Sequence, residues 1–214
     1  MKKAEIRSLV RNSLPRVDKV NRYHDVYVDG VIEKVIASLY EDVWKTNPLN
    51  LQRYTMGFGY SVPIPVKTEN STGIKYSDIP DGMLFFQDKS SGLRRISTPL
   101  QGSFMFFPMD AREVDLVSNG SYFDTVNTKV GYIVNQNRVE YYNMNAAIQA
   151  TGVRMDAVMA FSKYLETDEV KIPEIADVRT GETFMDRVFK VLQLVKPVDL
   201  LDNNASPETV AKDN

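Results

Sequence analysis

The chain has 214 residues, of which 43% are hydrophobic and 25% are charged, and its formal net charge is −2. This composition is ordinary for a globular protein, and the small net charge excludes a global attraction to nucleic acid or membrane. There is no cysteine and one histidine, His24. Disulfides, thiolate metal sites, cysteine nucleophiles and multi-histidine metal sites within one chain are therefore excluded. The sequence shows neither a signal peptide nor an apolar run of membrane-spanning length, so we expect a cytosolic protein without membrane contact.

Residues 3–14 are predicted to form a short amphipathic helix that Pro15 ends. An isolated helix of this length is marginal in water, so it needs a partner surface, either its own core or another chain. We predict that its apolar face contacts other chains; that face comprises Ile6, Leu9, Val10 and Leu14.

The same segment is basic up to Arg22. This predicts contact with DNA or with an acidic partner, and a solvated helix face is the alternative interpretation. The candidate contact residues are Lys2, Lys3, Arg7 and Arg11.

Residues 25–45 carry the strongest helical pattern in the chain. Gly30 lies near the start of this stretch and weakens that turn, which a helix beginning at Asp29 would avoid. His24 precedes the helix and is interpreted as a surface or cap residue, and Pro48 closes the segment. The apolar stripe consists of Val28, Val31, Ile32, Val35, Ile36, Leu39, Tyr40 and Val43.

From residue 51 to residue 161, short β-branched and aromatic runs alternate with turn residues, as in an all-β module. Pro63 and Pro65 restrict one of these runs to a sheet edge or an extended arm. The runs 83–86 and 93–96 are expected to form a hairpin. Strands are predicted at 53–58, 61–66, 83–87, 93–97, 103–107, 113–117 and 122–124.

Residues 130–143 give the clearest hairpin. The alternation favours a loop with an even number of residues, either Gln136-Asn137 or 135–138. In that register Val134 faces Val139, Tyr132 faces Tyr141, and Gly131 lies opposite Tyr142, whose ring can cover the glycine. A loop with an odd number of residues would place polar and apolar side chains on the same face of the hairpin.

The last third of the chain is predicted as a strand at 153–161, a loop at 163–181 and a helix at 183–195. A helix is the alternative for 153–161, and the strand is favoured because Gly152 marks a break. Thr183 and Asp186 form an approximate capping box, and Pro197 ends the helix. The tail from Asp199 is expected to be disordered unless a partner orders it.

These elements predict an α+β protein. An antiparallel β-sandwich or barrel-like module at 49–165 is flanked by amphipathic helices from both ends of the chain. The N-terminal arm and long helix occupy 1–48, a linker and C-terminal helix occupy 166–198 and pack with the N-terminal helix, and 199–214 is the tail.

No catalytic motif is found, and we predict a protein without enzymatic activity, cofactor or metal. Asp110, Glu113 and Asp115 could form a metal site or a glycosidase-like pair, but a solvated strand face is the better interpretation. Arg94 and Arg95 point to opposite faces if they lie on one strand, which argues against a joint phosphate site.

The order of these parts resembles the head–tail connector proteins of tailed bacteriophages, specifically the ring or adaptor proteins of podovirus-like, crAss-like phages. The resemblance is carried by the basic first helix, the long apolar helix, the Val130-Gly131-Tyr132-Ile133-Val134 hairpin strand, and the final helix leading to 197–204. It implies a structural protein of the virion, assembled in the cytoplasm of the bacterial host. It also implies a twelvefold ring between the portal protein and the neighbouring ring or tail proteins.

A carbohydrate- or protein-binding β-sandwich, such as an adhesin or a capsid decoration module, is the alternative function. In the connector hypothesis both chain ends contact other chains, because their apolar residues would otherwise stay in water. At the C-terminal end these residues are Leu200 and Leu201.

Overall fold

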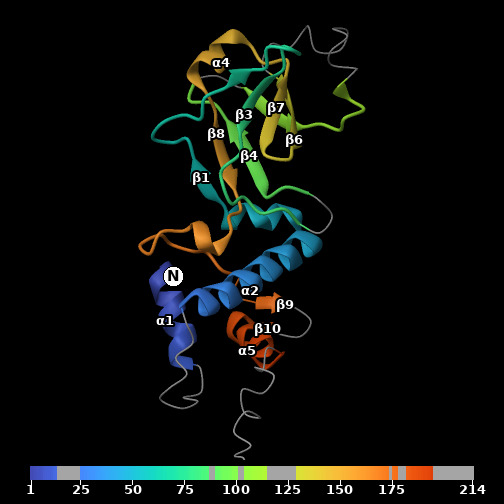
Figure 1. The fold of residues 1–214 in the computed structure, drawn as a ribbon. Coiled ribbons are helices and arrows are strands. Elements are labelled where there is room, and N and C mark those ends of the chain that lie inside the picture. Colours follow the sequence, from blue (N-terminus) through green and yellow to red (C-terminus); the bar gives the residue numbers. More distant parts are fainter. Residues whose placement is uncertain are drawn as a thin grey trace, which may run out of the picture.

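The computed structural model describes residues 1–13, 25–86, 90–100, 104–114, 129–173, 175–177 and 182–194. The elements form a β layer that stands on a helical layer (Figure 1). The protein is therefore of mixed α+β class, as predicted. Leu14, His24, residues 122–124 and the tail from 195 onward lie outside the described residues.

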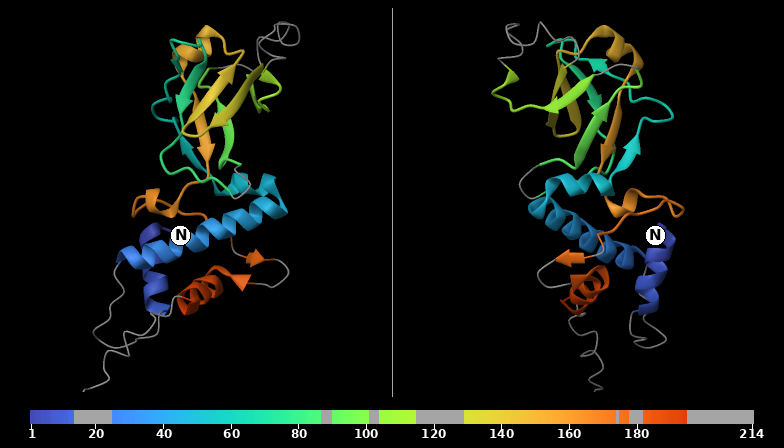
Figure 2. Two further views of the ribbon diagram at one scale, coloured as in Figure 1. Left: turned by 45° about the vertical axis from the view of Figure 1, so that its right-hand side comes forward. Right: turned by 180° about the vertical axis from the view of Figure 1, so that it is seen from behind.

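The helical layer is built on one long helix, α2 (Asp25–Thr46), which includes Gly30 rather than starting at Asp29. The short helix α1 (Lys3–Ser13) and the C-terminal helix α5 (Phe184–Leu194) both pack on α2, and Figure 2 shows all three from two sides. The predicted stripe on α2 is buried from Val28 to Tyr40. The predicted cap of α5 is confirmed, because the Thr183 amide donates to Asp186 Oδ2 at 2.8 Å and the Asp186 amide donates back to Thr183 Oγ1 at 3.3 Å.

The β layer contains two sheets. The first has five strands in the order β2 (Lys67–Thr68), β3 (Lys75–Asp78), β7 (Arg138–Tyr142), β6 (Lys129–Asn135) and β5 (Met105–Pro108). The second has three strands in the order β1 (Met56–Phe58), β8 (Arg154–Ala157) and β4 (Leu93–Ser97). Buried residues of both sheets and of the helical layer belong to one apolar core.

The expectation of a purely antiparallel module is wrong at one position, since β5 runs parallel to β6. Parallel neighbours need a long crossover connection, and the chain between Pro108 and Lys129 provides one. The described strands do not close into a barrel.

The central hairpin has the predicted register. Val134 pairs with Val139, Tyr132 with Tyr141 and Gly131 with Tyr142 across β6 and β7. The side chain over Gly131 is that of Met109, however, and not the Tyr142 ring.

Other boundaries differ from the prediction. Residues 48–54 form the 3₁₀-helix η1 (Pro48–Tyr54), which is capped by Asn47 and replaces the start of a predicted strand. The segment 83–86 is hydrogen-bonded to 90–92, because the Gly92 amide donates to the Leu84 carbonyl at 2.7 Å and the Phe86 amide donates to the Ser90 carbonyl at 2.9 Å. Strand β4 beyond it pairs with β8, so the predicted hairpin between 83–86 and 93–96 is not formed. Segment 153–161 contains the strand β8, as favoured, and is followed by η2 (Phe161–Lys163).

The sequence did not predict the strands β2 and β3, the short helix α4 (Ala146–Thr151), or the small hairpin of β9 (Ile175–Asp177) with β10 (Glu182–Thr183). Of this hairpin, β9 lies inside the segment 163–181 that was expected to be a loop. No described helix combines the length and apolar character needed to cross a membrane.

Two glycines give opposite predictions for stability. Gly30 lies inside α2 with nothing within 4 Å of an added Cβ, so Gly30→Ala should raise the free energy of unfolding by about 0.8–1 kcal/mol. Gly152 has φ +78° and an added Cβ would meet the Ile64 carbonyl oxygen at 2.6 Å, so Gly152→Ala should lower it by more than about 1 kcal/mol. Urea denaturation followed by circular dichroism measures both, and a loss of stability in Gly30→Ala would contradict this account of α2.

Candidate functional site

The apolar face of α1 is largely used by the chain itself. Ile6 and Val10 are fully buried in the common core, whereas Leu9 is exposed. The prediction that this face contacts other chains is therefore wrong for Ile6 and Val10, because the core of the chain itself already buries them. The other predicted interface residues, Leu14, Leu200 and Leu201, lie outside the described residues.

Two of the four predicted basic contact residues are also engaged within the chain. Lys3 is buried, and its Nζ donates to the carbonyl oxygens of Tyr164 at 2.9 Å and Ser162 at 3.2 Å. Arg7 donates from Nε to Asp29 Oδ1 at 2.7 Å and from Nη1 to Glu166 at 3.0 Å. The prediction of a DNA or acidic-partner contact is thus wrong for Lys3 and Arg7, since carbonyl and carboxylate oxygens of the chain already occupy their donors. Lys2 and Arg11 lie on the surface.

The arm is held in place by main-chain hydrogen bonds to a segment far away in the sequence. The Lys3 amide donates to the Asp168 carbonyl at 3.1 Å, and the Val170 amide donates to the Met1 carbonyl at 2.8 Å. The side-chain bonds to Asp29 raise the pKa of Arg7. The first residues therefore form a fixed part of the helical layer.

The acidic residues considered for catalysis do not meet in a site. Asp110 and Glu113 share a turn, in which the Asp110 amide donates to Glu113 Oε2 at 2.8 Å, and Asp115 lies outside the described residues. Glu113 and Val114 are therefore not on a strand, which corrects the start of the predicted strand at 113–117, and the rest of that prediction lies outside the described residues. Among the residues that the structure describes, no group of three or more His, Cys, Asp or Glu is placed to hold a metal ion.

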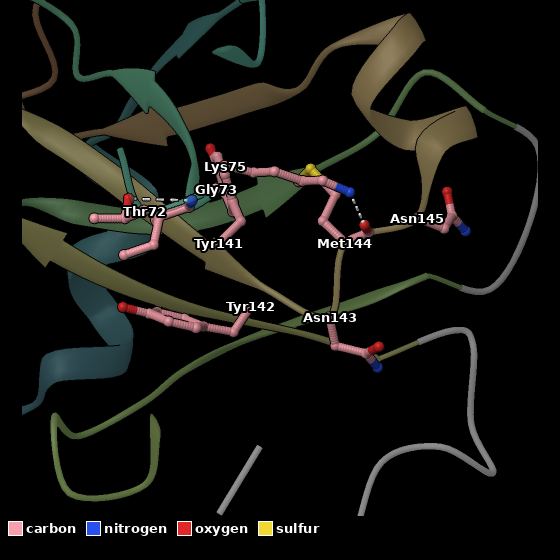
Figure 3. Close-up of a pocket in the computed structure, with 9 residues that line it drawn as sticks. Thr72, Gly73, Lys75, Tyr141, Tyr142, Asn143, Met144 and Asn145 are labelled. Atoms are coloured by element: carbon pink, nitrogen blue, oxygen red, sulfur yellow. Dashed lines mark hydrogen bonds between the residues drawn. The ribbon is translucent and has the colours of Figure 1, made fainter. Parts of the chain in front are cut away.

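A polar pocket of about 300 Å³ lies at one end of the five-stranded sheet (Figure 3). It is bounded by the turn before β3, including Thr72 and Gly73, and by the segment from Tyr141 to Asn145. Lys75 crosses it, and its Nζ donates to the Met144 carbonyl oxygen. Asn143 Nδ2 donates to the Lys129 carbonyl at 3.0 Å.

The wall of this pocket continues into a network around Glu140, a carboxylate that is only 6% exposed. Glu140 accepts from Arg138 Nε at 2.8 Å, Asn135 Nδ2 at 3.2 Å and the Tyr142 hydroxyl at 3.3 Å. Burial and the neighbouring Glu140 raise the pKa of Tyr142. Arg138 also pairs with Glu69 at 3.3 Å. Arg138 thus binds two carboxylates at once, and this network of hydrogen bonds and ion pairs stabilises the sheet.

Large apolar side chains are exposed at both ends of the helical layer. Val26, at the start of α2, is 85% exposed, and Leu49, in η1, is 83% exposed. Leu165 is 68% exposed and lies next to Glu166, the partner of Arg7. Sequence reasoning missed these residues, although Val26 falls outside the apolar stripe of α2 and could have been noticed for that reason.

A scan of protein-family models finds no match to this chain, and a search of curated proteins finds no significantly similar sequence.

The buried position of Lys3 gives a prediction that distinguishes a structural arm from a binding arm. Lys3→Met leaves the carbonyls of Ser162 and Tyr164 without their donor, and should lower the free energy of unfolding by about 1–3 kcal/mol. Lys2→Met, at an exposed side chain one residue earlier, is the matched control and should change it by less than about 0.5 kcal/mol. Thermal and urea denaturation measure the difference, and equal stability of the two variants would refute the role assigned to Lys3.

Proposed function

We propose that this protein is a structural protein without catalytic activity that assembles head to tail with copies of itself into a ring. The connector of a tailed bacteriophage, between the portal and the neighbouring ring or tail proteins, is the form of such an assembly that the sequence resembles. The observation that supports ring formation is the placement of exposed apolar side chains at the two opposite ends of the helical layer.

The length of α2 separates these two surfaces. The helix has 22 residues and so extends for roughly 33 Å, with Val26 near its first residue and Leu49 beyond its last. Leu165 lies at the end where α2 begins, because Arg7 bridges Glu166 to Asp29. One end thus carries Val26 and Leu165, and the opposite end carries Leu49.

Two different apolar surfaces on opposite sides of one subunit favour a head-to-tail contact. Such a heterologous interface joins one surface to the other on the next copy, and the copies close into a ring when the rotation between neighbours divides a full turn without a shift along the axis. A two-fold dimer would instead use a single self-complementary surface and leave the other in water. In the proposed subunit the β layer is sandwich-like, because its two sheets face a shared core. The ring formed by these subunits is part of the virion.

The two surfaces can be tested with single substitutions that are then mixed. Val26→Glu places a charge in the apolar surface at one end, and Leu49→Glu places a charge in the surface at the other end. Each variant alone should therefore be monomeric under conditions in which the wild-type protein forms higher oligomers. An equimolar mixture should give dimers, because the intact end of one variant meets the intact end of the other. Mass photometry and analytical ultracentrifugation measure the masses.

Val62→Glu is the control for this experiment. Val62 is 80% exposed, as much as the other two residues, but it lies in the β layer after β1. It should leave assembly unchanged. Wild-type protein that stays monomeric at high concentration and with the portal protein, or a mixture that yields no dimers, would overturn the proposal.

A further inference from the structure

The outer face of the three-stranded sheet carries two arginines close together. Along β8, Met155 and Ala157 point into the core, so Arg154 and Asp156 point outward. Arg95 of β4 pairs with Asp156, and Ser97 pairs with Arg154. Arg95 and Arg154 are therefore diagonal neighbours on one face, with Cα atoms roughly 7–8 Å apart.

A tyrosine ring lies beside them in a fixed position. Tyr60 is 49% exposed, and its hydroxyl donates to Asp156 Oδ1 at 2.9 Å. The guanidinium of Arg154 lies 5.3 Å from the centre of the Tyr60 ring. Gly57 lies under the ring, since an added Cβ there would come within 2.7 Å of Tyr60 Cε2. The glycine thus makes room for an aromatic platform next to the two cations.

The positive charges of this face are not neutralised within the described part of the chain. There, Arg95 is exposed and its side chain makes no hydrogen bond or ion pair. Nε of Arg154 is buried without a hydrogen-bond partner, and the one nearby carboxylate, Asp156, is bonded to Tyr60. The face therefore has a net positive charge and unused donors, which an anionic partner would satisfy.

We propose that Arg95, Arg154 and Tyr60 form a binding surface for single-stranded nucleic acid. The two guanidinium groups donate to phosphate oxygens, and the Tyr60–Arg154 pair provides the surface against which a base stacks. The carboxylates of an acidic peptide would pair with the two arginines only, whereas a nucleic acid strand would pair its phosphates with the arginines and also stack a base on the exposed Tyr60 ring. This surface lies on the β layer, away from the two ends of the helical layer, so the proposal does not depend on ring formation.

Fluorescence anisotropy with a labelled oligothymidine tests the proposal. Arg95→Ala and Arg154→Ala should each weaken binding and reduce the slope of log K against log salt by about 0.7, as expected for one lost phosphate contact on a single strand. Tyr60→Leu should weaken binding about tenfold, and Tyr60→Phe should retain most of the affinity because the ring remains. Asp156→Asn should tighten binding, since it removes the negative charge but keeps an acceptor for the Tyr60 hydroxyl.

Arg53→Ala is the matched control, because Arg53 is an exposed arginine of η1 in the helical layer and should not affect binding. Thermal denaturation of every variant verifies that it is folded. The proposal is overturned if the wild-type protein does not bind the oligonucleotide at low salt, if Arg53→Ala weakens binding as much as Arg95→Ala, or if Asp156→Asn fails to tighten it. Tighter binding of duplex DNA, or equal competition by polyglutamate, would also overturn it.

The assembly variant Val26→Glu separates this inference from the proposed ring. A monomeric Val26→Glu protein should bind a short oligonucleotide with the affinity of the wild-type subunit, because the substituted residue is in the helical layer. Loss of binding in this variant would contradict a site confined to the β layer, whereas loss of assembly alone would leave it intact.

Discussion

Helix α2 presents apolar side chains over so much of its circumference that no single neighbour can cover them. Its buried residues run from Val28 to Tyr40, and α1, α5, η1 and η2 all pack against it. Two of these elements come from the ends of the chain, and the other two lie on either side of the β layer in the sequence. Covering α2 therefore requires the whole chain to close around one helix, and this ties the helical and β layers into one core.

This constraint explains why the basic arm is a structural element. To reach α2, the first residues must lie along the segment from Phe161 to Val170, whose carbonyl groups need donors. The ammonium group of Lys3 and the main-chain amides of the arm supply these donors. A buried lysine is tolerated there because two carbonyl oxygens and the face of the Phe161 ring surround it.

Charged residues at the periphery of the helical layer also fix the covering helices to α2. Arg7 joins α1 to α2 through Asp29, and Arg187 of α5 bonds to Ser38 of α2 at 3.1 Å. These contacts fix how α1 and α5 lie across α2. Val26 at the start of α2 and Leu49 in η1 remain exposed outside these contacts, whereas Trp44 in the last turn of α2 stacks on Phe86.

The sequence predicted elements whose pattern is simple and local. The register of the β6–β7 hairpin followed from strict alternation, and α2 and α5 followed from their apolar stripes. The strand β3 was missed because it reads Lys75-Tyr76-Ser77-Asp78, with one buried position that is a serine. The hydroxyl of Ser77 is bonded to that of Tyr141 at 2.6 Å, so a polar contact across strands replaces the apolar contact that a sequence pattern would reveal.

The surface was harder to predict than the core, since it depends on pairing between distant segments. The neighbouring Arg94 and Arg95 do point in different directions, and the guanidinium of Arg94 stacks on Trp44 at 4.5 Å. What sequence spacing could not show is that β8 places Arg154 beside Arg95, with 58 residues between them in the chain. Likewise, the apolar residues of the arm were expected to contact other chains, because nothing in the local sequence decides between another chain and the protein's own core, where Ile6 and Val10 are buried.

The two proposed surfaces are compatible in one assembly because they belong to different layers. Contacts through the ends of α2 would leave the β layers of successive copies standing side by side, and each copy would repeat the Arg95–Arg154–Tyr60 face. A single face of two arginines and one ring can bind a strand only weakly. Repetition around a ring raises the effective concentration of the second and later contacts, so a weak site per subunit is sufficient for a stable complex. The same geometry predicts that affinity for long strands depends on assembly, whereas affinity for short ones depends only on the face itself.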